Sequence, residues 1–95
     1  MPIPTPRILH PHIAVDEAIC GGSPSIITTR FPVRSVVHYV LHLGFMPEEL
    51  IARFPHLTFA QVHDALAYSY DNQHEIEADL AANRDEVARP PVPPA

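Results

Sequence analysis

Proline sets where this chain can form regular structure, because twelve of its 95 residues are prolines. Four lie within residues 2–11, and four more lie within the closing sequence PPVPPA. Proline has no backbone N–H and cannot supply a full set of hydrogen-bond donors, so segments this rich in proline do not form helices or sheets. We therefore predict one folded domain over residues 12–88, between a proline-rich N-terminal segment (1–11) and a proline-rich tail (89–95).

The chain is long enough for one small domain with a thin core. A protein of this length buries only about 60–65% of the surface that its unfolded chain exposes, so we expect a second copy to add cover in a homodimer. A single cysteine excludes an internal disulfide. The N-terminal sequence lacks the apolar stretch of a secretion signal, and no run of 18 apolar residues follows. We expect a cytoplasmic protein with no membrane partner.

The charge balance excludes one class of function. The formal net charge is −5, and all six basic residues are arginines. A protein that binds nucleic acid without regard to sequence needs a net basic surface. Site-specific DNA binding remains open only if a few arginines gather on one face.

The first third of the folded region predicts short extended segments around a glycine turn. Residues His12–Val15 and the β-prone Ser25–Thr29 are the strand candidates, with a turn over Cys20–Pro24 between them. Gly21-Gly22 is followed by neither Lys-Ser/Thr nor a helix, so we interpret it as a structural turn and not as a phosphate loop. Cys20 has no basic neighbour that would lower its pKa, which favours an inert thiol over a nucleophile.

From Val33 onward the apolar residues follow a helical period. The expected buried stripe consists of Val33, Val36, Val37, Val40 and Leu41. Gly44 is the expected end of this helix. The opposite side is expected to carry Arg34, His38, Tyr39 and His42.

Three further helices are expected. A short one begins at Pro47, with Glu48 and Glu49 favourable at its positive N-terminus, and ends before Pro55. The next begins with a capping box formed by Thr58 and Gln61. Its inward stripe is expected to be Val62, Ala65, Leu66, Ser69 and Tyr70. Asn72 is then expected to cap a polar helix from about Gln73 to Val87, whose narrow apolar stripe suits a helix partly covered by another chain.

Two helices joined by a four-residue turn describe a helix-turn-helix, and at this point the sequence resembles a known family. The segments ICGGSP, TRFPV and LGFMPEELIARFPHLTFAQVHDALAYSYDN are similar to the bacterial domain of unknown function 433, over about residues 12–75. The matching positions are Gly21, Gly22, Pro24, Thr29, Arg30, Val33, Gly44, Glu48, Glu49, Pro55, Leu57, Thr58, Ala65, Leu66 and Tyr68. The resemblance implies a mostly α fold: a homeodomain-like helix-turn-helix core of three helices, a short N-terminal β-hairpin segment and an extra C-terminal helix.

One position departs from the family pattern. The glycine usual before Thr-Arg is Thr28 in this chain. A glycine there serves a turn with positive φ, a conformation that threonine tolerates badly. How this chain makes the turn is a question that the resemblance leaves open.

Members of the family are often encoded beside a PIN-like nuclease toxin and are described as VapB-like antitoxins. The resemblance therefore implies a protein that binds and neutralises such a nuclease. The C-terminal segment, residues 73–95, is the expected toxin-binding region, with Arg84 and Arg89 reaching acidic groups of the nuclease site. The expected toxin-binding residues are Ile76, Leu80, Arg84, Val87 and Arg89.

A second interpretation is a DNA-binding regulator without a toxin partner, and an antitoxin that represses its own promoter would need the same activity. The helix that begins at Phe59 offers few groups for reading bases, because it holds no arginine and carries Asp64 and Asp71. The candidate DNA-binding residues are Arg30, Arg34, Arg53, Gln61 and His63.

Nothing in the sequence predicts an enzyme, a cofactor or a catalytic residue. The pairs His10/His12 and His38/His42 have spacings that can place two imidazoles on one metal ion. No further ligand at a suitable spacing completes either set, so we predict no metal site, with the two pairs as the alternative to be tested.

Overall fold

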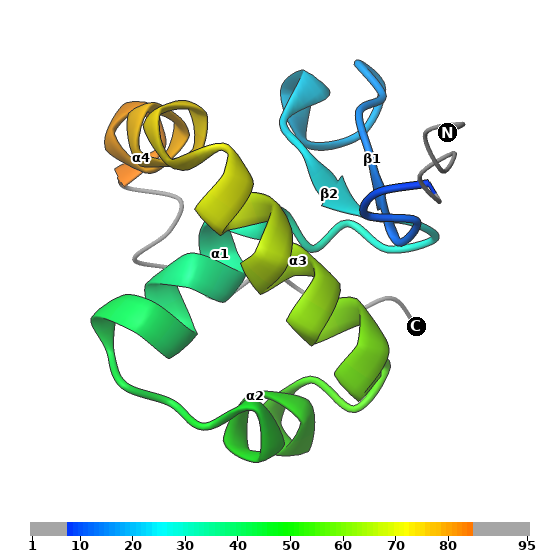
Figure 1. Cartoon of the computed structure of the whole chain (residues 1–95), viewed down its shortest axis with the longest axis vertical. Helices are drawn as coiled ribbons and strands as arrows, with labels where there is room; N and C mark the ends of the chain where they lie inside the picture. Colours follow the sequence, from blue (N-terminus) through cyan, green and yellow to red (C-terminus); the bar gives the residue numbers. More distant parts are fainter. Residues whose placement is uncertain (1–7, 85–95) are drawn as a thin grey trace, which may run out of the picture.

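The computed structural model describes residues 8–84 of the chain. The fold is mostly helical, as expected: α1, α2 and α3 form a helix-turn-helix core, a small hairpin lies beside α3, and α4 packs next to α1 (Figure 1). Most of the predicted N-terminal segment and the whole predicted tail lie outside the described residues. The elements are β1 (Ile13–Ala14), η1 (Cys20–Gly22), β2 (Ser25–Ile26), α1 (Val33–Val37), η2 (His38–His42), α2 (Pro47–Arg53), α3 (Phe59–Asp71) and α4 (Gln73–Ala82).

The hairpin is shorter than the sequence predicted. Strands β1 and β2 pair antiparallel, with Ile13 opposite Ile26 and Ala14 opposite Ser25. One more backbone hydrogen bond extends the pairing, in which the Ile27 N–H donates to the His12 carbonyl at 2.8 Å. Two-residue strands cannot be stable alone, so the hairpin depends on α3, against which it packs.

The connection between the strands is a left-handed turn over the Cys-Gly-Gly sequence. Cys20, Gly21 and Gly22 all have positive φ, at 52°, 64° and 88°. The turn is closed by the Gly22 N–H, which donates to the Ile19 carbonyl at 3.1 Å. Only glycine adopts such angles without steric cost, which is the physical reason for the glycine pair.

The turn after β2 has a left-handed residue at Thr28, where the family pattern has glycine. Thr28 has φ of 67°, the left-handed conformation that the expected glycine would serve. Neighbouring Thr29 closes the turn, because its N–H and its hydroxyl both donate to the Ile26 carbonyl, at 3.1 and 2.8 Å. The chain therefore keeps the turn and bears the strain of a β-branched residue within it.

The first helix is not a uniform α-helix. After Val37 it continues as a π-helical turn, η2, in which the Leu43 N–H donates to the His38 carbonyl at 2.9 Å. The wider turn changes which side chains face inward. Tyr39 is buried and Leu41 is 42% exposed, the reverse of the predicted arrangement.

The second and third helices begin where the sequence predicted. Pro47 opens α2. At α3 the capping box is present, with the Gln61 N–H donating to Thr58 Oγ1 at 3.2 Å and the Thr58 N–H donating to Gln61 Oε1 at 2.9 Å. The predicted inward stripe of α3 is wrong at one position, because Tyr70 is 59% exposed.

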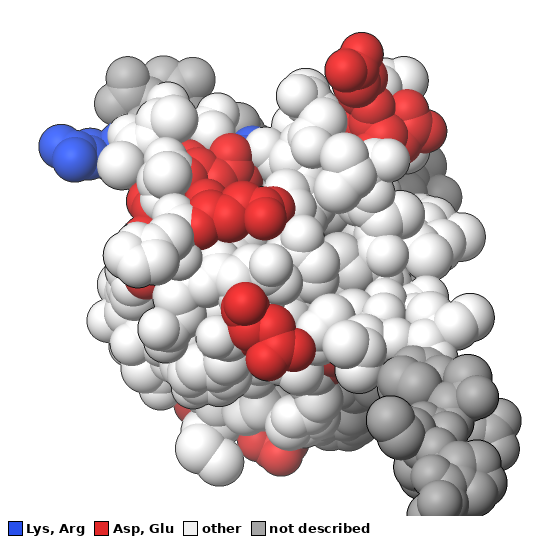
Figure 2. Space-filling view, turned by 45° about the horizontal axis from the view of Figure 1, so that its top comes forward, with Lys and Arg blue, Asp and Glu red and all other residues white. Residues whose placement is uncertain are grey.

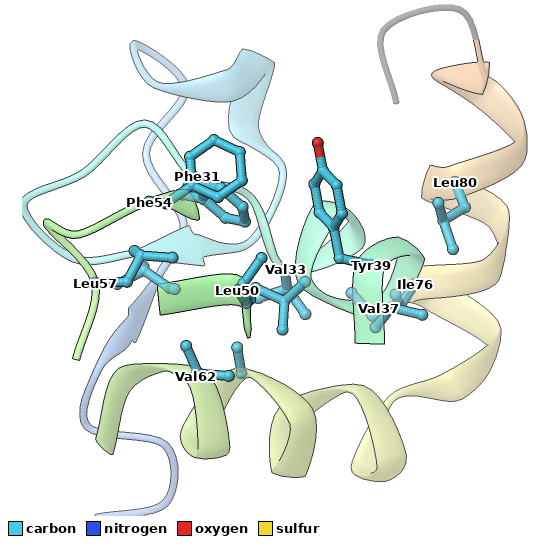
Figure 3. Close-up of a cluster of buried hydrophobic side chains, with 13 residues drawn as sticks. Phe31, Val33, Val37, Tyr39, Leu50, Phe54, Leu57, Val62, Ile76 and Leu80 are labelled. Atoms are coloured by element: carbon cyan, nitrogen blue, oxygen red, sulfur yellow. The ribbon is translucent and has the colours of Figure 1, made fainter. Parts of the chain in front are cut away.

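The hydrophobic core joins all four α-helices and the segment that follows the hairpin. Phe31 and Phe54 meet edge to face at 4.9 Å between ring centres, and Leu50 and Val62 are fully buried beside them (Figure 3). From α4, Ile76 lies next to Val37 of α1 (Figure 3). Burial of an isoleucine contributes about 1.5–3 kcal/mol, so α4 is an integral part of the domain.

None of the helices within residues 8–84 combines the length and hydrophobicity that a membrane crossing requires.

Candidate functional site

A buried ion pair fastens α4 to α1. The side chain of Arg34 is 1% exposed, and its Nη1 donates to Asp79 Oδ2 at 3.0 Å. The other carboxylate oxygen of Asp79 accepts from Ser23 Oγ at 2.8 Å and from Asn83 Nδ2 at 3.1 Å. Asp79 thus connects α1, α4 and the glycine turn. The prediction that Arg34 contacts DNA is corrected, because its guanidinium lies inside the domain.

A second charged cluster fastens the N-terminal segment to α3. The two ring nitrogens of His10 face two carboxylates, with Nδ1 3.1 Å from Asp64 Oδ1 and Nε2 2.8 Å from Asp71 Oδ2. The His12 N–H donates to Asp64 Oδ2 at 2.8 Å, and the ring of Tyr68 meets His10 edge to face at 5.3 Å. We call His10, Asp64 and Asp71 the His10 latch and residues 8–12 the strap.

The strap covers the flank of α3 that carries Asp64, Tyr68 and Asp71. These residues share one face of the helix, since they lie four and seven positions apart. In a helix-turn-helix the second helix of the motif is the one that reads DNA. Here that helix is acidic, holds no arginine, and is covered on one flank.

The remaining candidate DNA-binding residues do not form one basic surface. Gln61 uses its side-chain oxygen in the capping box, and His63 is exposed on α3. Arg53 is exposed, with its guanidinium 6.0 Å from the ring centres of Tyr39 and Phe45. Arg30 is exposed on a different segment, the turn before α1. On the face drawn in Figure 2, acidic side chains are spread widely and basic side chains occupy a small area.

The expected toxin-binding residues differ in their exposure: two are buried and one is exposed. Ile76 is 1% exposed and Leu80 is 9% exposed, and both pack into the domain's own core. The prediction that these two side chains contact a toxin is therefore corrected, because they are buried within this domain. Arg84 is exposed, and Val87 and Arg89 lie outside the described residues.

Three exposed apolar side chains follow closely in sequence where the first helix passes into the second. Leu41 is 42% exposed, Leu43 is 54% exposed and Met46 is 58% exposed, all within six residues of chain. Gly44, at φ of 78°, makes the bend that presents them. We call these three side chains the α1–α2 ledge. The amphipathic pattern alone did not indicate it, because the π-helical turn brings Leu41 to the surface.

The histidine pairs do not form a metal centre within the described residues. His38 and His42 have ring centres 6.4 Å apart, and His42 Nε2 lies 3.7 Å from Glu77 Oε1. Burial lowers the pKa of His38, and the charge of His42 lowers it further. His10 is directed at carboxylates, and residues 8–84 contain no group of three histidine, cysteine or acidic side chains placed to hold an ion.

A shallow hollow of about 390 Å³ lies between the glycine turn and α4. Its lining consists of Gly21, Gly22, Ser23, Pro24, Glu75, Ala78, Asp79 and Ala82. Among these lining residues there are two carboxylates and no cation, and both oxygens of Asp79 already accept hydrogen bonds. This chemistry disfavours a phosphate. The nearby Cys20 is half-buried, and its thiol donates to the Arg30 carbonyl at 3.4 Å.

Comparison with known proteins places the chain in a family. The family described as "Protein of unknown function (DUF433)" matches residues 13–69, more than half of the chain. The chain belongs to the DUF433 family. A DUF433 member from Anabaena variabilis, whose crystal structure was determined at 2.00 Å resolution, is 33% identical and superposes with a TM-score of 0.69. The likeness covers 74% of this chain and 68% of that one. No curated protein matches the chain.

Several residues of this DUF433 protein that match the family pattern build its turns and caps, and others, such as Val33 and Ala65, lie in its core. Gly21 and Gly22 form the left-handed turn, Thr29 closes the turn before α1, and Thr58 caps α3. Arg30 differs from these, because its side chain is exposed and makes no hydrogen bond or ion pair to another residue in the range 8–84. The shared pattern therefore accounts for the fold and says little about chemistry.

Proposed function

We propose that this DUF433 protein is an antitoxin-like binding protein that neutralises a PIN-like nuclease, and that the α1–α2 ledge is its principal contact surface. The observation that carries the proposal is the exposure of Leu41, Leu43 and Met46 within one short connection. Contiguous exposed apolar groups are typical of protein-binding surfaces, and the proposal takes these three side chains to form such a surface. The class of partner comes from the resemblance to VapB-like antitoxins.

The same surface properties argue against DNA as the principal partner. Neutralising phosphates requires lysine or arginine beside the reading helix, and α3 offers Asp64 and Asp71 instead. The strap occupies one of its flanks. The net charge of −5 adds a general repulsion from DNA.

The α4 segment has a different role in this proposal from the one that the sequence predicted. Ile76 and Leu80 hold α4 within the domain, so α4 is not a free arm that orders on the toxin. Arg84, which is exposed just beyond the end of α4, stays in the proposal as a secondary contact with acidic groups of the nuclease.

The test is inhibition of a PIN-like nuclease encoded beside the gene. We expect the full chain to abolish RNA cleavage near equimolar ratio. The double variant Leu43→Arg/Met46→Arg is expected to weaken inhibition by about 30-fold or more, since substitution of hot-spot residues at the centre of an interface costs at least about 2 kcal/mol. The control is Ala60→Arg/Ala67→Arg, which adds the same two charges at exposed positions of α3 and is expected to inhibit like the wild type.

Each other result has a definite meaning. Failure of the wild-type chain to inhibit or to bind the nuclease overturns the proposed function. If both double variants inhibit equally well, the toxin contact lies outside the ledge. A gel shift on upstream DNA with wild type and Arg30→Ala tests the regulator hypothesis, which requires salt-sensitive binding that weakens in the variant.

A further inference from the structure

The His10 latch has a geometry that only a charged imidazole satisfies. Each ring nitrogen of His10 lies within hydrogen-bond distance of a carboxylate oxygen, on Asp64 for Nδ1 and on Asp71 for Nε2. A neutral imidazole has one N–H, so it can donate to one of these carboxylates and presents a lone pair to the other. The imidazolium form donates to both. The contact is therefore favourable on both sides only while the ring carries its second proton.

The two carboxylates of the latch differ in their exposure to solvent. The Asp64 side chain is 12% exposed and the Asp71 side chain is 61% exposed. Asp64 is stabilised by His10 and by the His12 N–H, whereas Asp71 lies at the edge, where water reaches it. The latch thus joins a shielded carboxylate to one that is open to solvent.

The aromatic side chain that meets the His10 ring, Tyr68, does not titrate in the neutral range. Burial raises the pKa of Tyr68, and its hydrogen bond to Glu75 of α4 raises it further, so the phenol stays neutral. His12 contacts the latch through its backbone N–H. For His10 itself, burial lowers the pKa, but the hydrogen bonds to Asp71 and Asp64 and their charges outweigh burial, and the pKa is raised above 6.5.

The backbone of the strap depends on this contact. His10 has φ of 54°, a left-handed angle that is unfavourable for a residue other than glycine. The turn that follows is closed by the Ile13 N–H, which donates to the His10 carbonyl at 3.1 Å. The bonds of the His10 ring oppose relaxation of the turn.

We propose that the His10 latch is a proton-operated fastener, which holds the strap on α3 while His10 is charged and weakens when His10 loses its proton, so that the strap is released more often. Release uncovers the flank of α3 formed by Asp64, Tyr68 and Asp71. Because the pKa of His10 is raised, the fastening is complete below pH 6.5 and is lost as the pH rises through the higher value of the folded protein. Each pH unit above that midpoint lowers the charged fraction of His10 about tenfold.

Assigned NMR spectra of the full chain between pH 5.5 and 9 test the proposal. The expected midpoint of the His10 ring lies above 6.5. The His12 amide and the Tyr68 ring are expected to shift with the same midpoint, and the exchange protection of the His12 amide is expected to fall over the same range. A His10 midpoint at or below 6.5, or a His12 amide that does not follow it, overturns the proposal.

Two variants make the test specific. Asp71→Asn removes the exposed carboxylate without cutting into the core, and it is expected to lower the His10 midpoint and bring strap release to lower pH. Glu77→Gln removes the same charge beside His42 and is expected to leave both unchanged. An equal response to the two substitutions would show that overall charge, and not the latch, sets the titration. None of these measurements uses the nuclease, so their outcome is independent of the proposed function.

Discussion

Two charged clusters fasten segments that are distant in sequence, and they differ in depth and in the kind of cation. Arg34 meets Asp79 in the interior, where its side chain is 1% exposed. His10 meets Asp64 and Asp71 at the rim, where one of its acids is largely open to water. Arginine keeps its charge at every pH that proteins encounter, whereas histidine changes charge near neutrality. One cluster is therefore permanent and the other is adjustable.

The difference shows why burial decides what an ion pair does. A buried pair adds little net stability over an apolar replacement, yet removal of one member is strongly destabilising because a charge remains in the interior. A pair at the surface is screened and contributes at most about 1 kcal/mol. We therefore expect the Arg34–Asp79 pair to hold the fold together and the His10 latch to govern a local opening.

Substitution of Asp79 is expected to have the largest effect. Asp79→Ala withdraws the carboxylate from Arg34 and the shared acceptor from Ser23 and Asn83. We expect the free energy of unfolding to fall by about 3–5 kcal/mol, measured by urea denaturation at pH 7. The matched control, Glu77→Ala, removes an exposed acid from the same helix and is expected to change stability by less than about 0.5 kcal/mol.

A small effect of Asp79→Ala would break the comparison. It would mean that the surroundings of the Arg34 guanidinium other than Asp79, or water admitted by a modest movement of α4, are enough to hold its charge. The two clusters would then be equivalent in energy, and their different depths would carry no consequence.

The sequence predicted local features well because they depend on neighbouring residues. The capping box of α3 needs only Thr58 and Gln61, which lie three positions apart. The start of α2 at Pro47 likewise depends only on the residues of its own first turn. Such features are determined within a single turn of chain.

The clusters could not be predicted in this way. Arg34 was placed on the solvent side because the apolar period puts it opposite the valines, and its partner Asp79 lies 45 positions away. His10 was considered as a metal ligand with His12, while its actual partners lie 54 and 61 positions away. A pair of acids seven positions apart on one helix was the only available signal for the latch.

The ledge was missed for a different reason. The predicted stripe assumed α-helical geometry throughout, and η2 departs from it. A change of one residue per turn is enough to exchange the environments of Tyr39 and Leu41. Pattern reading alone has no signal for where a π-helical turn will form.

Removal of the switchable charge is expected to have a smaller effect that depends on pH. Asparagine tolerates the left-handed conformation of His10 but does not titrate. The substitution His10→Asn therefore removes the titratable ring without straining the turn. Because the pKa of His10 is raised in the folded state, its contribution is complete below pH 6.5 and disappears as the pH rises through the folded value. We expect the stability advantage of wild type over the variant to be larger at pH 6 than at pH 9, by up to about 1 kcal/mol.

Urea denaturation of both proteins at a series of pH values measures this difference. Asp79→Ala serves as the reference, since its deficit comes from an arginine and is expected to stay constant from pH 6 to 9. A constant deficit for His10→Asn as well would remove the distinction between the permanent and the adjustable cluster.

The smallest expected effect comes from backbone strain at Thr28, which involves no charge. Relieving this strain tests whether the two charged clusters alone account for the stability of the N-terminal region. Thr28 bears a left-handed angle that costs about 1–2 kcal/mol in an L-residue, while glycine loses about 0.5–1 kcal/mol through its freedom in the unfolded chain. Thr28→Gly is therefore expected to stabilise the protein by about 0.5–1 kcal/mol, independently of pH. The matched control is Thr29→Gly, one position along, which removes the hydroxyl that donates to the Ile26 carbonyl and accepts from the Phe31 N–H; it is expected to destabilise. If both substitutions destabilise, the Thr28 side chain contributes contacts that outweigh its strain, and the turn is fitted to threonine in this chain.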